Sequence, residues 1–187
     1  MKTLKLLSLV LITGIIFQSC SSDDDNPDPV NEEEVITTLT ATLNGGGSTV
    51  TMTFQDLDGD GPGAPTMNVS GPLAAGTTYT GSLDLLNEAE SPAESITEEI
   101  EEEDDEHQFF FSSTNNIGTF AYTDMDGDGN PVGLSFTLTT GAATTGNVTI
   151  ILRHEPSKGA PGVSDGDITN AGGETDISVT FTNVIVQ

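Results

Sequence analysis

Two histidines and the carboxylates beside them are the residues best suited to chemistry in this sequence. His107 follows Glu106 and begins an aromatic run, and His154 precedes Glu155 at the end of an apolar run. Because side chains in a strand alternate between its two faces, both imidazoles fall on the apolar side of their runs, and we expect them to meet at one rim of a sheet. Two imidazoles with one or two carboxylates suit zinc or a similar borderline metal better than calcium. The alternative is that each histidine only ends a strand.

Two aspartate loops could hold a harder cation. The pattern D-x-D-x-D-G occurs twice, with carboxylates at Asp56, Asp58 and Asp60 and again at Asp124, Asp126 and Asp128. In EF-hand loops alternate carboxylates at this spacing converge on calcium, and the glycine permits the sharp turn. The twelfth position should carry a glutamate but carries Met67 and Ser135. A calcium site here would need a further carboxylate and would serve mainly as a structural staple. The alternative is plain hairpin-turn chemistry, to which Asp and Gly are equally suited.

An acidic run, residues 98–106, leads directly to His107. Like charges repel and need water, so the run is typical of a solvated loop; the alternative is a lip that collects cations on the binding face. It is also part of the only stretch, near 95–106, with a spacing that would suit a helix.

The elements that must position these residues are strands. Short Thr, Val, Ile and Phe runs are separated by Gly, Pro, Asn and Asp, which predicts an all-β fold. The alternation of apolar and polar residues predicts which side of a strand faces the core. The inward residues are Val148, Ile150 and Leu152 in one run and Ile177, Val179 and Phe181 in another.

The chain also contains an internal repeat, 48–112 and 116–187, in which the two aspartate loops correspond. With an extra strand near 35–43 this gives about nine strands, which predicts an antiparallel sandwich or barrel. An acidic loop or short helix is inserted near 87–106. We expect residues 35–187 to form a single, monomeric domain.

The N-terminus predicts an exported lipoprotein. A basic head and a short apolar core, too short to span a membrane, form a signal peptide over 1–19. It ends at Cys20, the only cysteine, in a segment similar to a lipobox, so we expect Cys20 to carry palmitate and other acyl chains. Residues 20–34 then form an acidic, disordered tether, which begins like the acidic tag of Bacteroidetes surface lipoproteins.

Composition excludes several classes of function. The chain has 30 acidic and 4 basic residues and a formal net charge of −26, which repels nucleic acid and attracts cations or a basic partner. It has no second cysteine, no nucleophile elbow, no phosphate loop and no His-Glu-x-x-His motif, and the absence of Trp argues against a sugar-stacking cleft. We therefore expect a non-enzymatic protein.

Four strings of the sequence resemble a known group. They are Asn-Glu-x-Glu-Ser-Pro-Ala-Glu, Glu-Asp-Asp-Glu-His-Gln-Phe-Phe-Phe, Arg-His-Glu-Pro and Gly-Val-Ser-Asp-Gly-Asp-Ile-Thr-Asn-Ala-Gly-Gly-Glu-Thr-Asp. They are similar to flavobacterial (Bacteroidetes) surface lipoproteins labelled "type 1 periplasmic binding fold superfamily protein". That fold is a pair of α/β lobes, whereas this sequence has no βαβ pattern, so the residues still predict an all-β domain.

The resemblance implies a lipid-anchored protein of the outer membrane or cell surface, accessory to a TonB-dependent transporter. A position facing the periplasm is the alternative. Together with the histidines, this predicts a protein that captures a cation or a cation-bearing ligand. The alternative is a structural or adhesive protein stabilised by calcium in its aspartate loops.

Overall fold

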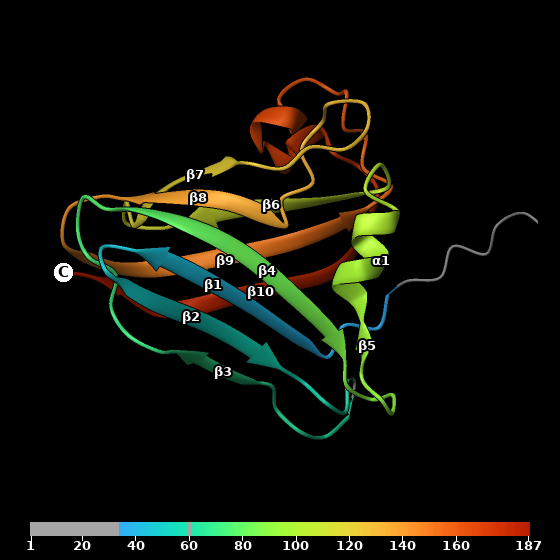
Figure 1. Cartoon of the computed structure of the whole chain (residues 1–187), viewed down its shortest axis with the longest axis horizontal. Helices are drawn as coiled ribbons and strands as arrows, with labels where there is room; N and C mark the ends of the chain where they lie inside the picture. The colour runs from blue at the N-terminus through green and yellow to red at the C-terminus, as the bar shows by residue number, and fades with distance from the viewer. Residues whose placement is uncertain (1–33, 60) are drawn as a thin grey trace, which may run out of the picture. The chain divides into compact units, whose positions relative to one another are not determined.

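The computed structural model describes residues 34–59 and 61–187. The predicted signal peptide, Cys20, most of the predicted tether and Asp60 lie outside the described residues. The described part belongs to one compact unit, Glu33–Gln187, shown in Figure 1. Its strands are β1 (Thr38–Gly45), β2 (Ser48–Gln55), β3 (Thr66–Val69), β4 (Thr78–Asn87), β5 (Glu94–Ser95), β6 (His107–Ser113), β7 (Gly118–Tyr122), β8 (Ser135–Thr140), β9 (Thr144–His154) and β10 (Glu174–Val186).

The ten strands of the described residues form two antiparallel sheets. The larger has the order β3-β2-β1-β4-β8-β7, with the short β5 paired to β4, and the smaller has the order β10-β9-β6. The smaller sheet lies behind the larger one in the view of Figure 1. The prediction of an all-β fold is confirmed, and of the two architectures left open by the sequence it is the sandwich that forms.

A single main core lies between the sheets. The alternating residues of β9 and β10 that the sequence marked as inward, among them Ile150 and Val179, are buried in it. On one side the sheets are joined, because Leu73 bridges to Val186 of β10 and exchanges backbone hydrogen bonds with Ile185 and Gln187. On the other side the end strands β6 and β7 pair only with β9 and β8, respectively, among the named strands. The sandwich is therefore closed at the β3/β10 side and more open at the β6/β7 side.

The acidic insertion contains a short helix, α1 (Ile96–Glu102), rather than a loop throughout. The Ser95 side chain accepts a hydrogen bond from the Glu98 backbone N–H and so caps its first turn. Ile96 and Ile100 face inward and are buried, while the glutamates between and beyond them mostly face solvent. No helix in the described part of the chain is long and apolar enough to cross a membrane.

The two halves of the sequence repeat are alike in their hairpins and differ beyond them. The aspartate loops join β2 to β3 and β7 to β8, both antiparallel pairs at the ends of the larger sheet. The following strands of the two halves diverge, since β4 lies in the larger sheet and β9 lies in the smaller one. This divergence puts β6 and β10 on either side of β9, and that is the arrangement that builds the site.

Candidate metal centre

Two imidazoles and two carboxylates converge at the end of the sandwich where α1 lies. His107 begins β6 and His154 ends β9, and the antiparallel register pairs these two residues directly. Their rings are 4.6 Å apart between centroids. Glu34, which precedes β1, and Asp176 of β10 complete a group whose four ligand atoms all lie within 4.8 Å of one another. We refer to these four residues as the tetrad.

The tetrad is buried. The side chains of His107 and Asp176 have 0% relative exposure, that of His154 has 5% and that of Glu34 has 6%. Glu34 Oε2 and His154 Nδ1 are buried without a hydrogen bond, and His107 Nε2 is buried against Glu34 Oε1. Buried polar atoms normally have such partners, so this group of atoms requires an explanation.

The two histidines present lone pairs or protons toward the carboxylates. Glu34 Oε1 lies 2.8 Å from His107 Nε2, and Glu34 Oε2 lies 3.6 Å from His154 Nδ1. Asp176 Oδ1 lies 3.9 Å from His154 Nδ1. In a tetrahedral zinc site with bonds of about 2.0 Å, neighbouring ligand atoms are roughly 3.3 Å apart. The observed separations lie on both sides of this value, so small side-chain movements would bring the ligands to bonding distance.

The tautomer of His107 is set by the backbone. Its Nδ1 lies 3.1 Å from the carbonyl oxygen of Glu103, and because a carbonyl only accepts, Nδ1 must carry the proton and donate it. Nε2 of the neutral ring is then an acceptor that faces the acceptor oxygen of Glu34. Two acceptors this close repel each other unless a proton or a metal ion lies between them. A histidine whose outer nitrogen donates to a backbone carbonyl is also the usual form of a metal ligand.

Proton binding at this pair has a definite direction. Burial lowers the pKa of His107, but the hydrogen bond and charge of Glu34 raise it by more, so it lies above its ordinary value. For Glu34, burial raises the pKa and His107 lowers it by more, so the net shift is downward. Both shifts favour a protonated His107 imidazolium beside an ionised Glu34 carboxylate.

The turn before β10 brings Asp176 into the tetrad. Gly173 has a φ of +67°, and a Cβ there would overlap the carbonyl oxygen of His154, so only glycine permits this close approach. The Arg153 guanidinium holds the turn by donating to the carbonyl oxygens of Gly172 and Gly173. The register then shifts between Thr175 and Ile177. Asp176 is the extra residue of this bulge, which turns its side chain inward.

Of the four residues that the sequence predicted for this site, His107 and His154 lie in the tetrad, and Glu106 and Glu155 lie outside it. The last two form a second group with His154, whose ligand atoms also lie within 4.8 Å of one another. Glu106 Oε2 is 3.7 Å from His154 Nε2, and its side chain is 50% exposed. Glu155 is exposed and has a φ of +48°, an uncommon conformation for a residue other than glycine.

Sequence reasoning missed Glu34 and Asp176. Glu34 was included in the acidic tether, although its side chain packs against the domain. Asp176 directly precedes Ile177, which lies on the inward face together with Val179. Because neighbouring residues of a regular strand point to opposite faces, periodicity alone points Asp176 outward. Its signal was the Gly172-Gly173 pair just upstream, which is typical of a tight turn or bulge.

The second aspartate loop is organised by the protein itself. Asp124 accepts hydrogen bonds from the backbone N–H groups of Gly133 and Ser135. Asp126 accepts them from the backbone N–H groups of Asp128 and Asn130 and from the Lys158 ammonium, which lies 3.0 Å from its Oδ2. The lysine supplies the positive charge that a cation would bring. This geometry favours the turn alternative for the loop.

The first aspartate loop has a different arrangement. Asp58 accepts a hydrogen bond from the Gly63 backbone N–H, as in a turn. Asp56 Oδ1, however, is buried without a hydrogen bond, beside a cavity of about 290 Å³ that Asp58 also lines. Calcium in this loop therefore stays a prediction, and Asp60 lies outside the described residues.

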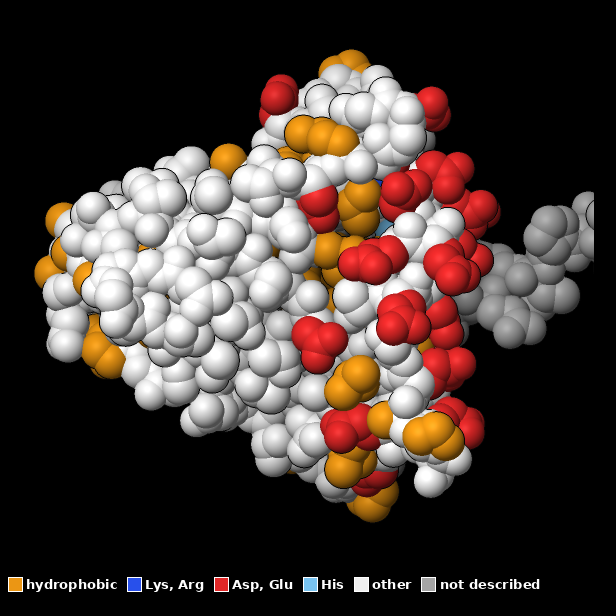
Figure 2. Space-filling model, viewed as in Figure 1, with side chains coloured by type: hydrophobic (Ala, Val, Ile, Leu, Met, Phe, Trp, Pro, Cys, Tyr) orange, Lys and Arg blue, Asp and Glu red, His pale blue; other side chains and the backbone are white. Residues whose placement is uncertain are grey.

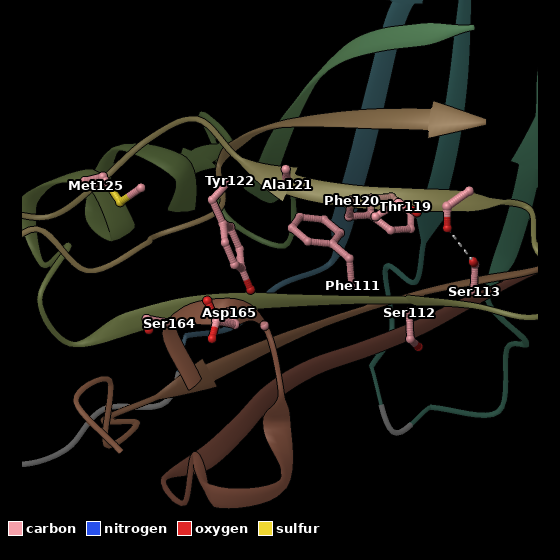
Figure 3. A pocket seen from close by; sticks show the side chains of 12 residues that line it. Phe111, Ser112, Ser113, Thr119, Phe120, Ala121, Tyr122, Met125, Ser164 and Asp165 are labelled. Atoms are coloured by element: carbon pink, nitrogen blue, oxygen red, sulfur yellow. Dashed lines mark hydrogen bonds between the residues drawn. The ribbon is translucent and has the colours of Figure 1, made fainter. Parts of the chain in front are cut away.

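A larger cavity, of about 560 Å³, lies at the open β6/β7 side and away from the tetrad. Figure 3 shows Phe111 of β6 and Phe120 and Tyr122 of β7 reaching into the space between the two strands. The Phe111 and Phe120 rings stack with centroids 5.1 Å apart, and the Tyr122 hydroxyl donates to the carbonyl oxygen of Phe109. These contacts hold the two sheet edges together, and the cavity contains no cluster of ligand side chains among the described residues.

No family model matches this chain, and no curated protein and no solved structure matches it either.

Proposed function

We propose that this protein is a membrane-anchored, non-enzymatic binding lipoprotein that captures a divalent transition-metal ion, with zinc as the type case, at the tetrad. The observation that carries the proposal is the burial of two imidazoles and two carboxylates in one group, with Glu34 Oε2 and His154 Nδ1 making no hydrogen bond. Burying such groups is costly unless a proton or a metal ion compensates them.

The chemistry of the donors favours this class of metal. Imidazole nitrogen suits zinc, copper and nickel, whereas calcium prefers six to eight oxygen ligands. Two carboxylates and two neutral imidazoles also balance the charge of one divalent ion. A closed set of four protein ligands is typical of a binding or structural site, since a catalytic zinc keeps a position open for water or substrate.

The anchoring and the partner in this proposal are inferred from the sequence and from the resemblance described above. Acylation at Cys20 would hold the domain at the outer membrane or cell surface, and the resemblance to flavobacterial surface lipoproteins suggests work beside a TonB-dependent transporter. Captured metal would then be passed to the transporter.

The proposal is tested by titrating the full chain with zinc and following binding by calorimetry and unfolding by denaturant. At zinc about 100 times the dissociation constant, the free energy of unfolding should rise by about 2.7 kcal/mol. Glu34→Gln and His154→Ala should each abolish most of this gain. Glu102→Gln, which removes one exposed carboxylate from α1, is the matched control and should keep it. A zinc response that is absent, or that survives both tetrad substitutions, refutes the proposal.

A second candidate function is a structural or adhesive surface protein whose first aspartate loop binds calcium. The buried Asp56 Oδ1 without a hydrogen bond supports it. Calcium should then raise the free energy of unfolding, and Asp56→Asn should remove the effect while Asp126→Asn leaves it. If calcium stabilises the Asp56→Asn variant as much as the wild type, the first loop is an ordinary turn.

A further inference from the structure

His154 faces two groups of carboxylates with its two ring nitrogens. Nδ1 is directed to the tetrad, with Glu34 Oε2 at 3.6 Å, and Nε2 is directed to the exposed Glu106, with Oε2 at 3.7 Å. Glu155 joins Glu106 on the outer side. We call Glu106, His154 and Glu155 the outer triad. The same imidazole therefore forms the boundary between a buried site and a solvent-exposed one.

The outer triad is open to solvent where the tetrad is closed. Glu106 and Glu155 are exposed, whereas the His154 side chain has 5% exposure and its Nδ1 is buried without a hydrogen bond. The ring of His154 therefore separates the buried tetrad from solvent on the side of the outer triad. Glu106, whose side chain is 50% exposed, lies at the solvent side of this ring, 3.7 Å from Nε2.

The surface around the outer triad is strongly acidic. Figure 2 shows that acidic side chains gather at the end of the molecule where α1 lies, while the other end of the same face carries almost none. The exposed acidic residues of this surface include Glu98, Glu101, Glu102, Glu103, Asp105, Glu106 and Glu155. Charge of one sign around a site raises the local concentration of the opposite ion and speeds its association.

We infer that the outer triad is the loading site of the tetrad: a divalent metal first binds Glu106, Glu155 and His154 Nε2, and then moves inward as His154 changes to coordination through Nδ1. This inference rests on the proposed function and adds the way in which the metal enters and leaves. Because the outer triad and the tetrad share His154, they bind the metal one after the other and not at the same time. Each chain therefore retains one metal ion.

A different role for Glu106 is the main competing explanation. A carboxylate that accepts a hydrogen bond from the outer nitrogen of a metal-bound histidine fixes the ring, and its loss typically costs 10–100-fold in affinity. The 3.7 Å separation from Nε2 exceeds hydrogen-bond distance. Glu155, whose carboxylate belongs to the same group of ligand atoms, would have no part in such an orienting role. The geometry therefore favours loading.

The experiment measures zinc association by stopped flow against a chelating indicator and zinc release by a chelator chase, with the full chain. Glu106→Gln with Glu155→Gln removes the carboxylates of the loading site. Glu101→Gln with Glu102→Gln is the matched control, because it removes two exposed carboxylates from the same acidic surface. Removing a site on the path slows both association and release of zinc. We therefore expect both rates to fall about tenfold relative to the control pair, with the dissociation constant changed by less than about twofold.

Three outcomes overturn the inference. Equal rates in the two double variants would mean that only the general charge of the surface matters. A weaker affinity caused by faster release alone would give Glu106 an orienting role. Two zinc ions retained by one chain would mean that the outer triad is a permanent second site. Absence of zinc binding by the wild type would instead refute the proposed function, so the two failures are distinguishable.

Discussion

Lys158 and Asp126 form an ion pair that is buried between the second aspartate loop and the segment after β9. Their side chains have 5% and 1% relative exposure, and the ammonium also donates to the carbonyl oxygens of Asp104 and Pro131. Removing one partner of a buried pair leaves the other charge uncompensated. The pair therefore joins the acidic insertion to the second loop by a contact that the aspartate pattern alone could not reveal.

Asp126→Asn should lower the free energy of unfolding by about 3 kcal/mol, because the Lys158 ammonium stays buried without its counter-ion. Adding Lys158→Met should recover part of the loss, since the charge is removed as well. Urea unfolding of the two variants and the wild type measures both effects. A double variant as unstable as the single one would show that packing, and not charge, is what the single substitution disturbs.

The same carboxylate gives a pH dependence. Burial raises the pKa of Asp126, but hydrogen bonds from Asn130 and the Lys158 ammonium lower it by more, so the folded-state pKa lies below the ordinary 3.8. The stability that ionised Asp126 contributes is then fully present above 3.8 and is lost as the pH falls through the lower folded-state value. The stability difference between wild type and Asp126→Asn should shrink between about pH 5 and about pH 3. A difference that stays constant over this range contradicts the assignment.

At the scale of elements, the turn before β10 decides whether the tetrad forms. Gly172 and Gly173 both have positive φ, but they differ in their surroundings: a Cβ on Gly172 would have its nearest neighbour 4.0 Å away, whereas one on Gly173 would overlap the His154 carbonyl oxygen. Only the second substitution would push β10, and Asp176 with it, away from His154.

Gly172→Ala should therefore cost about 1 kcal/mol of stability, from backbone strain alone, and leave zinc affinity close to that of the wild type. Gly173→Ala should cost more and weaken zinc binding as well. Thermal unfolding and zinc titration of the two variants provide a matched comparison. Equal zinc affinities would show that the tetrad tolerates movement of β10.

Strands β6 and β9 show how far sequence patterns reach. Alternation placed His107 and His154 on the apolar sides of their strands, and the structure pairs them in register. For β10 the same rule misplaced Asp176, because a bulge changes the parity of every residue upstream of it. In the acidic insertion, the burial of Ile96 and Ile100 stabilises α1, because a helix of 7 residues is too short to be stable alone.

At the scale of the whole molecule, the domain has an acidic end that contains the tetrad, the outer triad and Glu34 at the start of the described residues. Metal bound at the tetrad would join the segment before β1 to β6, β9 and β10. If Cys20 carries the lipid anchor, the connection between anchor and domain begins within a few residues of the metal.

Cys20→Ser should remove acylation, since serine lacks the thiol that is modified. We expect the wild type to incorporate labelled palmitate and to sediment with membranes, and the variant to do neither, because two or more acyl chains are needed for stable anchoring. Zinc binding should be the same in both proteins, which shows that the domain itself is intact. Membrane association of the variant would refute the anchoring prediction.

The sequence by itself determined the all-β class, the inward faces of β9 and β10, and the apolar side on which each histidine lies, because strand periodicity is a local property of the backbone. Only the tertiary structure decided the rest. It joined Glu34, Asp176 and the histidines, which lie far apart in the chain, and it supplied Lys158 to the second aspartate loop. These contacts depend on the order of the strands in two sheets and on one bulge, and neither leaves a periodic mark in the sequence.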